Sequence, residues 1–212
     1  MPGQATRSAW AEAARDLAVR DAVLAGLHER HGPPLLAPGP SASGRFESLA
    51  SSIAYQQLNG RAAATIWARV LDVVGTPFTP EAVRSAGADR LRSAGLSASK
   101  AAALVDLADK VAGGTVRLDR IGRLDDDEIV EHLTVVRGIG PWTAHMFLLF
   151  DLRRLDIWPV GDYGVRAGLA KANGWDVVPG ERDMAALGER YAPYRSVVAW
   201  WAWRELDTVT PR

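Results

Sequence analysis

The stretch that decides the fold is LTVVRGIGPWTAHMFLLF, residues 133–150. Its centre is a turn with two glycines, Gly138 and Gly140, followed directly by Pro141. Proline suits the first position of a helix, because the N–H that it lacks would have no intrahelical partner there. The pattern therefore predicts a helix, a two-glycine turn and a second helix. Glycines two residues apart let a bulky group approach the backbone, and the second helix presents N–H donors and a partial positive charge.

Such a turn is suited to binding one phosphate group. Pro141 cannot donate a hydrogen bond, so the expected donors are the backbone amides of Gly138 and Gly140 and those of Trp142 and Thr143 in the first helical turn. A Gly-X-Gly pair alone more often only joins two helices. That alternative stays open on these residues by themselves.

The segments on either side of this turn carry further signals. Upstream, residues 125–128 (DDDE) form a candidate N-cap with an acidic residue three positions later, which predicts the start of the first helix. Downstream lies IWPVGDYGVR, residues 157–166, in which Pro159 and Gly161 interrupt the chain. Asp162 then stands where a new helix would begin. Taken alone, Asp162 is either a helix cap or a functional carboxylate.

The rest of the chain predicts an all-α protein, because strand-like alternation of β-branched residues never persists. A flexible tail over residues 1–9 precedes the first helix, and a proline-rich connector follows at 32–44. Apolar residues recur at helical spacing, with Leu49 and Ile53 as one example. The helices expected from this spacing and from the helix-ending glycines lie at residues 10–31, 46–56, 61–74 and 99–111.

Composition excludes several classes of protein. The 212 residues include no cysteine, which excludes disulfides, thiolate nucleophiles and cysteine-bound iron–sulfur clusters. The 25 basic and 25 acidic residues balance, which argues against a protein that holds long nucleic acid by bulk charge but permits a small local contact. Apolar runs are far too short to span a membrane, so we expect a cytoplasmic protein without membrane contact.

Several ordered segments resemble one family. Residues 138–150 and 157–166 are similar to the helix-hairpin-helix DNA glycosylases, and specifically to the 3-methyladenine DNA glycosylase II (AlkA-like) branch. Residues 51–58, 62–70 and 193–204, together with Ala94 to Ser97, Lys100 and Ala101, also resemble that branch, so the similarity covers about residues 46–206.

The resemblance implies a two-lobed helix-hairpin-helix glycosylase fold of the HhH-GPD type over residues 10–212, with the active site in the cleft between the lobes. Lobe one would span about residues 47–155, with the hairpin at 126–150. Lobe two would combine residues 10–46 with 156–212.

The implied activity is base excision repair by a monofunctional DNA glycosylase, which hydrolyses the N-glycosidic bond of alkylated bases of the 3-methyladenine or 7-methylguanine type. Asp162 matches the catalytic carboxylate of the family. A sugar that loses its base acquires oxocarbenium character, so a nearby carboxylate stabilises it or activates water; we rank stabilisation first. An alkylated base is already positively charged and departs without a second acid.

Family members that also cut the strand carry a lysine two residues after the second glycine, where it forms a Schiff base with the sugar. This chain has Trp142 at that position. The resemblance therefore implies base release without strand cleavage, and no cofactor. The implied partner is double-stranded DNA with damaged bases, bound by a monomer.

Further site residues follow from the resemblance. Gln57 matches the side chain that fills the gap left by a flipped nucleotide, with Leu58 as a rival for this wedge. The base pocket would comprise Trp142, Tyr163 and Trp203, because aromatic faces stack on cationic bases.

A departure from the family is Met146, which replaces a pocket tyrosine of the best-known relative and leaves the range of accepted bases open. The neighbouring Trp200 and Trp201 are assigned to the core. Family hairpins often bind a monovalent cation through backbone carbonyls, which here match Thr134, Val136 and Ile139.

Other polar residues are weaker candidates. His28 and His31 have metal-ligand spacing but no third ligand, and are expected to be solvated. His132 and His145 flank the hairpin, where a surface or packing role is expected ahead of contact with a phosphate or with the damaged base. Basic side chains near helix starts and turns are phosphate contacts or simply solvated: Lys100, Arg137 and Arg166.

Two other functions stay open. A non-catalytic helix-hairpin-helix module that senses DNA damage would keep the hairpin but would not need Asp162. A glycosylase of the same architecture could instead act on deaminated bases.

Overall fold

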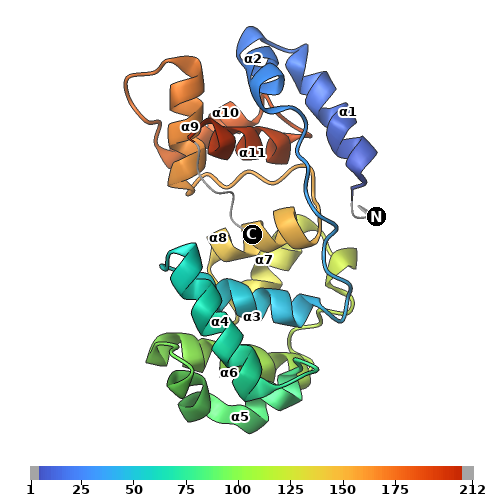
Figure 1. The fold of residues 1–212 in the computed structure, drawn as a ribbon. Coiled ribbons are helices and arrows are strands. Elements are labelled where there is room, and N and C mark those ends of the chain that lie inside the picture. The colour runs from blue at the N-terminus through green and yellow to red at the C-terminus, as the bar shows by residue number, and fades with distance from the viewer. Residues whose placement is uncertain (1–4, 207–212) are drawn as a thin grey trace. The chain divides into compact units, whose positions relative to one another are not determined.

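The computed structural model describes residues 5–206, and every regular element in this range is helical, which confirms the all-α prediction. The chain divides into two compact units. Unit 1 combines the two ends of the chain, up to Gly39 and from His145 onward, and unit 2 is Pro40–Ala144 (Figure 1). Within the described range, no helix has both the length and the apolar character needed to cross a membrane.

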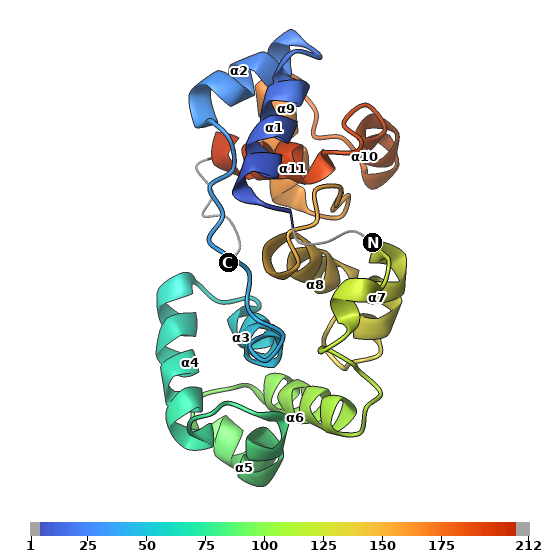
Figure 2. The ribbon, with the colours of Figure 1, turned by 90° about the vertical axis from the view of Figure 1, so that its right-hand side faces the viewer.

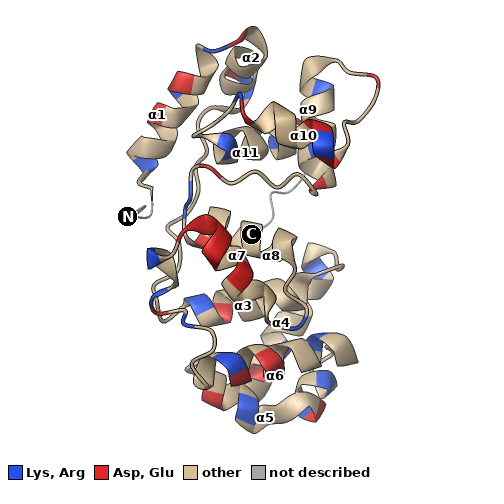
Figure 3. Ribbon diagram, turned by 180° about the vertical axis from the view of Figure 1, so that it is seen from behind, with Lys and Arg blue, Asp and Glu red and all other residues tan. Residues whose placement is uncertain are grey.

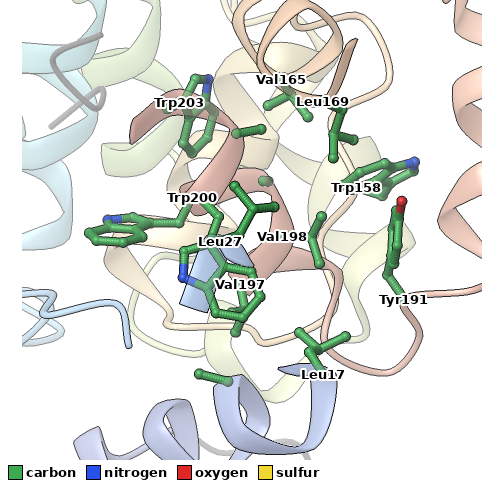
Figure 4. Close-up of a cluster of buried hydrophobic side chains, with 14 of the residues drawn as sticks. Leu17, Leu27, Trp158, Val165, Leu169, Tyr191, Val197, Val198, Trp200 and Trp203 are labelled. Atoms are coloured by element: carbon green, nitrogen blue, oxygen red, sulfur yellow. The ribbon is translucent and has the colours of Figure 1, made fainter. Parts of the chain in front are cut away.

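Unit 1 is built around a nearly apolar helix near the C-terminus. The inner helix is α11 (Arg195–Glu205), whose residues 196–203 are all buried. Trp158 and Tyr191 pack edge to face beside it, with ring centroids 5.5 Å apart (Figure 4). The surrounding elements are α1 (Arg7–Ala18), α2 (Ala22–His31), the π-helical turn η2 (Phe147–Asp151), α9 (Tyr163–Asn173) and α10 (Glu181–Gly188).

The first segment departs from the expected tail followed by one long helix. Helix α1 begins at Arg7 because the Oγ1 of Thr6 accepts the N–H of Ala9 at 3.2 Å, so residues 7–9 are helical. The predicted helix over 10–31 is two helices. The second begins after Asp21, whose carboxylate accepts the N–H of Leu24 at 2.9 Å. Residues 1–4 of the expected tail lie outside the described residues.

Unit 2 is a set of short helices packed in chain order. Helices α3 and α4, α4 and α5, and α5 and α6 pack against each other, and α3 also contacts α6 (Figure 2). The expected helices over 46–56, 61–74 and 99–111 are confirmed to within two residues at each end. Their bounds, with those of the other elements, are α3 (Arg45–Tyr55), α4 (Gly60–Val74), α5 (Pro80–Ser93), α6 (Ala98–Ala112), η1 (Ile121–Arg123) and α7 (Asp126–Thr134).

The predicted helix, two-glycine turn and helix are confirmed. Helix α7 starts with a complete capping box, in which Asp125 accepts the N–H of Glu128 and Glu128 accepts that of Asp125. Figure 3 shows the acidic first turn of this helix. The turn over residues 135–140 follows, and α8 (Pro141–Met146) begins at the expected proline. Unit 2 ends at Ala144, within α8.

Candidate active site

The two glycines of the hairpin have different structural roles. Gly138 has a φ of 80°, which side chains disfavour, and a Cβ there would lie 3.1 Å from the Cβ of Ala103. Gly140 has no positive φ, and a Cβ there would meet nothing within 4 Å. Gly138 is therefore required by the turn and by its packing on α6. Gly140 instead leaves open space beside the backbone.

Side chains from α6 and from Gln56, the residue that directly follows α3, support the hairpin. The carboxylate of Asp106 accepts the N–H of Arg137 at 2.7 Å, directly before the first glycine. The Nε2 of Gln56 donates to the carbonyl of Gly138 at 3.0 Å and to the Oγ1 of Thr143 at 3.3 Å. The conformation of the hairpin is thereby stabilised by residues that come earlier in the chain.

The turn between α3 and α4 holds both candidate wedge residues. Gln57 is exposed and adopts a φ of 56°, and Leu58 is 39% exposed. Asn59 ends the turn, because its side chain accepts the N–H of Ala62 at 2.9 Å and so begins α4. The structure therefore presents both candidate wedge residues, Gln57 and Leu58, at one exposed tip.

Asp162 lies in unit 1, where the structure confirms the helix-cap interpretation, while its role as a functional carboxylate stays a prediction. It is the N-cap of α9, and its Oδ1 accepts the N–H of Val165 at 2.8 Å. The same oxygen accepts the Nε1–H of Trp203 at 2.9 Å. The residue is only 8% exposed. Two donors on one oxygen fix the plane of the carboxylate.

Trp203 is held tightly around this hydrogen bond. Its ring stacks on Phe150 at 5.8 Å between centroids and is 1% exposed. A Cβ at Gly164 would lie 2.9 Å from the Cδ1 of Trp203 and 3.1 Å from the Oδ1 of Asp162. The absence of a side chain at Gly164 thus lets the indole reach the carboxylate. A base-stacking role for Trp203 stays a prediction, and the structure adds an orienting role toward Asp162.

The other proposed pocket residues differ in exposure. Trp142, in unit 2, is 42% exposed, and Tyr163, in unit 1, is 66% exposed with the guanidinium of Arg166 5.8 Å from the centre of its ring. Met146 is buried in the aromatic core of unit 1. The assignment of Trp200 and Trp201 to the core is confirmed, at 8% and 0% exposure.

The basic residues near the hairpin have varied surroundings. Lys100 is turned inward, since its Nζ donates to the carbonyl of Ala54 at 2.8 Å and to that of Gln56. Arg166 donates to the carbonyl of Pro179 at 3.1 Å, so it is neither simply solvated nor free of partners. The side chain of Arg137 is exposed.

The histidines are not a metal site in the described part of the chain, where no group of three metal-ligating side chains occurs. The expectation that His28 and His31 are solvated is wrong. His31 bonds the carboxylate of Glu205 at 2.8 Å, and His28 contacts the edge of Trp201 with ring centroids 5.9 Å apart. His132 has a structural role, as its Nε2 accepts the N–H of Arg117 at 2.8 Å.

Three residues that hold the hairpin or Trp203 in place were not predicted from the sequence. Gln56 carried a signal, because it is the first of two consecutive glutamines before the wedge turn. Asp106 and Phe150 carried none, since each acts through a contact distant in sequence, with Arg137 and with Trp203.

Comparison with known proteins identifies the family to which this geometry belongs. A model of the HhH-GPD superfamily base excision DNA repair proteins matches residues 50–193, a range that includes the wedge turn, the hairpin and Asp162. The chain belongs to this superfamily. Within it, the chain is 32% identical over 162 residues to DNA-3-methyladenine glycosylase 1 of Schizosaccharomyces pombe, which covers 75% of this chain and 71% of the relative.

Comparison with solved structures supports the same family assignment. A 3-methyladenine DNA glycosylase of S. pombe in complex with abasic DNA matches with a TM-score of 0.81 at 28% identity, covering 91% of this chain and 95% of that one. A DNA-3-methyladenine glycosidase of Bacillus halodurans matches with a TM-score of 0.79 at 31% identity, covering 91% and 88%. The predicted helix-hairpin-helix glycosylase fold is therefore confirmed.

Proposed function

We propose that this HhH-GPD protein is a monofunctional DNA glycosylase that removes alkylated bases of the 3-methyladenine or 7-methylguanine type from duplex DNA. The observation that carries the proposal is the buried carboxylate of Asp162, oriented on one oxygen by Val165 and Trp203. The names of its relatives, which are 3-methyladenine glycosylases, support the choice of substrate.

The proposed reaction needs one carboxylate. The bond between C1′ and the base nitrogen breaks, and its electron pair leaves with the base, which becomes neutral because alkylation had made it cationic. Positive charge develops on the sugar and is stabilised by the negative charge of Asp162. A water oxygen then bonds to C1′ and loses a proton, which yields an abasic site. A buried, pre-oriented carboxylate suits this role because it need not reorganise as the charge develops.

DNA binding is assigned to the exposed features of unit 2. A phosphate would be bound by amides of the hairpin, in the open space that Gly140 leaves beside the backbone. The tip at Gln57 and Leu58 would fill the gap left by the displaced nucleotide. The proposed phosphate donors are Gly138, Gly140, Trp142 and Thr143, and the proposed base-pocket residues are Trp142, Tyr163 and Trp203.

The hairpin also suits a monovalent cation. Thr134 ends α7, and Val136 and Ile139 follow in the turn, where the carbonyl of Val136 accepts the N–H of Ile139 at 3.1 Å and keeps a second lone pair. Neutral oxygen donors are those that hard alkali cations prefer. A bound cation would add positive charge near the phosphate.

The absence of strand cleavage is part of the proposal. Trp142 stands where strand-cutting relatives carry a lysine, and an indole cannot form a Schiff base with the sugar. One chain supplies the carboxylate, the hairpin and the wedge, so we propose that the enzyme acts as a cytoplasmic monomer.

The test is base release from methylated duplex DNA, with the freed bases identified by mass spectrometry. We expect methylated purines in the supernatant, alkali-labile but uncut strands, and no covalent adduct after borohydride treatment. Duplexes containing uracil or hypoxanthine, assayed in parallel, test the deaminated-base alternative. Release of no base from any substrate would instead favour a non-catalytic damage sensor, and a trapped adduct would overturn the monofunctional assignment.

A further inference from the structure

The turn that presents the wedge has an unfavourable backbone conformation. Gln57 adopts a φ of 56°, in the left-handed region, although it is not a glycine. This conformation costs about 1 kcal/mol or more and persists only where neighbouring contacts enforce it. The side chains at the tip are exposed, so the enforcement comes from the residues on either side of it.

Lys100 supplies the first constraint. Its Nζ donates to the carbonyl of Ala54, at 2.8 Å, and to the carbonyl of Gln56. The final carbonyls of a helix lack intrahelical partners, so an ammonium group that bonds two of them fixes how the chain leaves the helix. Lys100 reaches them from the first turn of α6, after the N-cap Ser97. The ammonium group of Lys100 therefore binds the carbonyls at the point where the chain leaves α3 and enters the wedge turn.

Gln56 supplies the second constraint. Its backbone carbonyl bonds Lys100, and its side-chain amide donates to the carbonyl of Gly138 at 3.0 Å and to the Oγ1 of Thr143 at 3.3 Å. These two acceptors flank Gly140, the glycine with open space beside it. One residue thus connects the base of the wedge turn to both sides of the proposed phosphate site.

We propose that Lys100 and Gln56 are positioning residues that hold the wedge tip at a fixed place relative to the hairpin. The proposal rests on the function proposed above and on the wedge at Gln57 or Leu58. Displacing a nucleotide from a duplex costs a few kcal/mol, which the wedge offsets only if it reaches the gap while the hairpin holds the backbone. A tip that is displaced or mobile no longer offsets this cost. The rate of base release should therefore fall on duplex substrates and stay nearly unchanged on single-stranded ones.

The experiment compares one methylated base in a duplex and in a single strand, in single-turnover assays of Lys100→Met, Gln56→Leu and Lys100→Arg. Lys171→Met is the matched control, because Lys171 also donates to a C-terminal helix carbonyl, that of Glu205, but in unit 1. We expect Lys100→Met and Gln56→Leu to lower the duplex rate about 10-fold or more and the single-strand rate by less than about 2-fold. Lys100→Arg should retain most duplex activity, and Lys171→Met should change neither rate.

A second measurement is independent of base release. A duplex with 2-aminopurine beside a stable abasic-site analogue reports insertion of the tip as a change in fluorescence. At saturating protein, Lys100→Met and Gln56→Leu should give less than half of the wild-type change. Equal losses on both DNA forms, or a wild-type fluorescence change in both variants, would overturn the proposal. A wild-type protein that releases no base would refute the proposed function, and the fluorescence result would still decide the role of these two residues.

Discussion

The carboxylate of Asp162 is almost completely buried and receives two N–H bonds on one oxygen. The hairpin and wedge turn of the other unit present an exposed Gly138, Gln57 and Leu58 instead. Unit 1 holds its proposed catalytic group inside an aromatic core. Unit 2 leaves its proposed DNA-binding groups at the surface and holds them through hydrogen bonds from Asp106, Lys100 and Gln56.

The difference fits the role proposed for each region. Stabilising a developing charge requires a group that is already oriented and shielded from water. Holding a phosphate and filling a gap in a duplex require groups that a large ligand can reach. Substitutions in unit 1 should therefore act mainly on the rate of the chemical step, and those in unit 2 mainly on binding to duplex DNA.

The largest expected effect is that of Asp162→Asn. Asparagine also caps helices, so α9 should still form, but the negative charge is lost. We expect base release to fall by at least about 100-fold while affinity for abasic-site DNA changes little. Asp21→Asn is the matched control, because Asp21 also caps a helix of unit 1. Near-normal release by Asp162→Asn, or an equal loss in the control, would contradict the catalytic role.

The two hairpin glycines allow a comparison within unit 2. Gly140→Val places a side chain in open space, so it should leave the melting temperature almost unchanged and lower affinity for all duplex sequences by about 10-fold at fixed salt. Gly138→Ala should instead destabilise the protein by about 1–2 kcal/mol, because of its positive φ and the contact with Ala103. Duplex affinity and thermal unfolding of both variants check this, and unchanged affinity in Gly140→Val would mean that DNA is held elsewhere.

Trp203→Phe tests the orientation of the carboxylate. Phenylalanine keeps an aromatic ring but removes the Nε1–H bond to Asp162, so we expect kcat to fall about 10-fold with little change in KM. Trp201→Phe is the matched control. Trp201 lies in the same helix as Trp203, and its Nε1–H donates to the carbonyl of Gly32 at 2.7 Å. Both variants should be destabilised, and only Trp203→Phe should slow base release. Equal activities would leave Trp203 a packing residue.

The smallest expected effect concerns acid stability. Partial burial opposes ionisation of Glu205, but hydrogen bonds from His31 and Arg30 outweigh it and hold its pKa below the ordinary value of 4.5. The stabilisation is therefore present above that value and lost as the pH falls through the lower pKa of the folded state. Glu205→Gln should cost about 0.5–1 kcal/mol at pH 7, without affecting base release, and the difference from wild type should vanish in acid unfolding experiments. A constant difference at all pH values would contradict this assignment.

Much of the fold could be predicted because its signals are local. The capping box at Asp125, the proline at the start of α8 and the N-cap at Asp162 each depend on residues within a few positions of each other. The prediction of one helix over residues 10–31 was wrong, although the signals that correct it are also local. Thr6 caps a helix that starts at Arg7, and Asp21 starts a second helix within a segment whose apolar pattern alone suggests one continuous helix.

The sequence by itself determined the helices over residues 46–56, 61–74 and 99–111 and the two-glycine turn, and through family resemblance it indicated the carboxylate of Asp162. Only the tertiary structure decided how these groups are held: Trp203 on Asp162, Gln56 on the hairpin, and Lys100 on the end of α3 rather than toward solvent. It also gave the two glycines different roles, since contact with Ala103 distinguishes Gly138 from Gly140. The physical reason is the separation along the sequence of the residues that interact. Caps and turns are encoded by neighbouring residues, whereas each of these contacts joins residues 35 or more positions apart, which only the packed chain brings together.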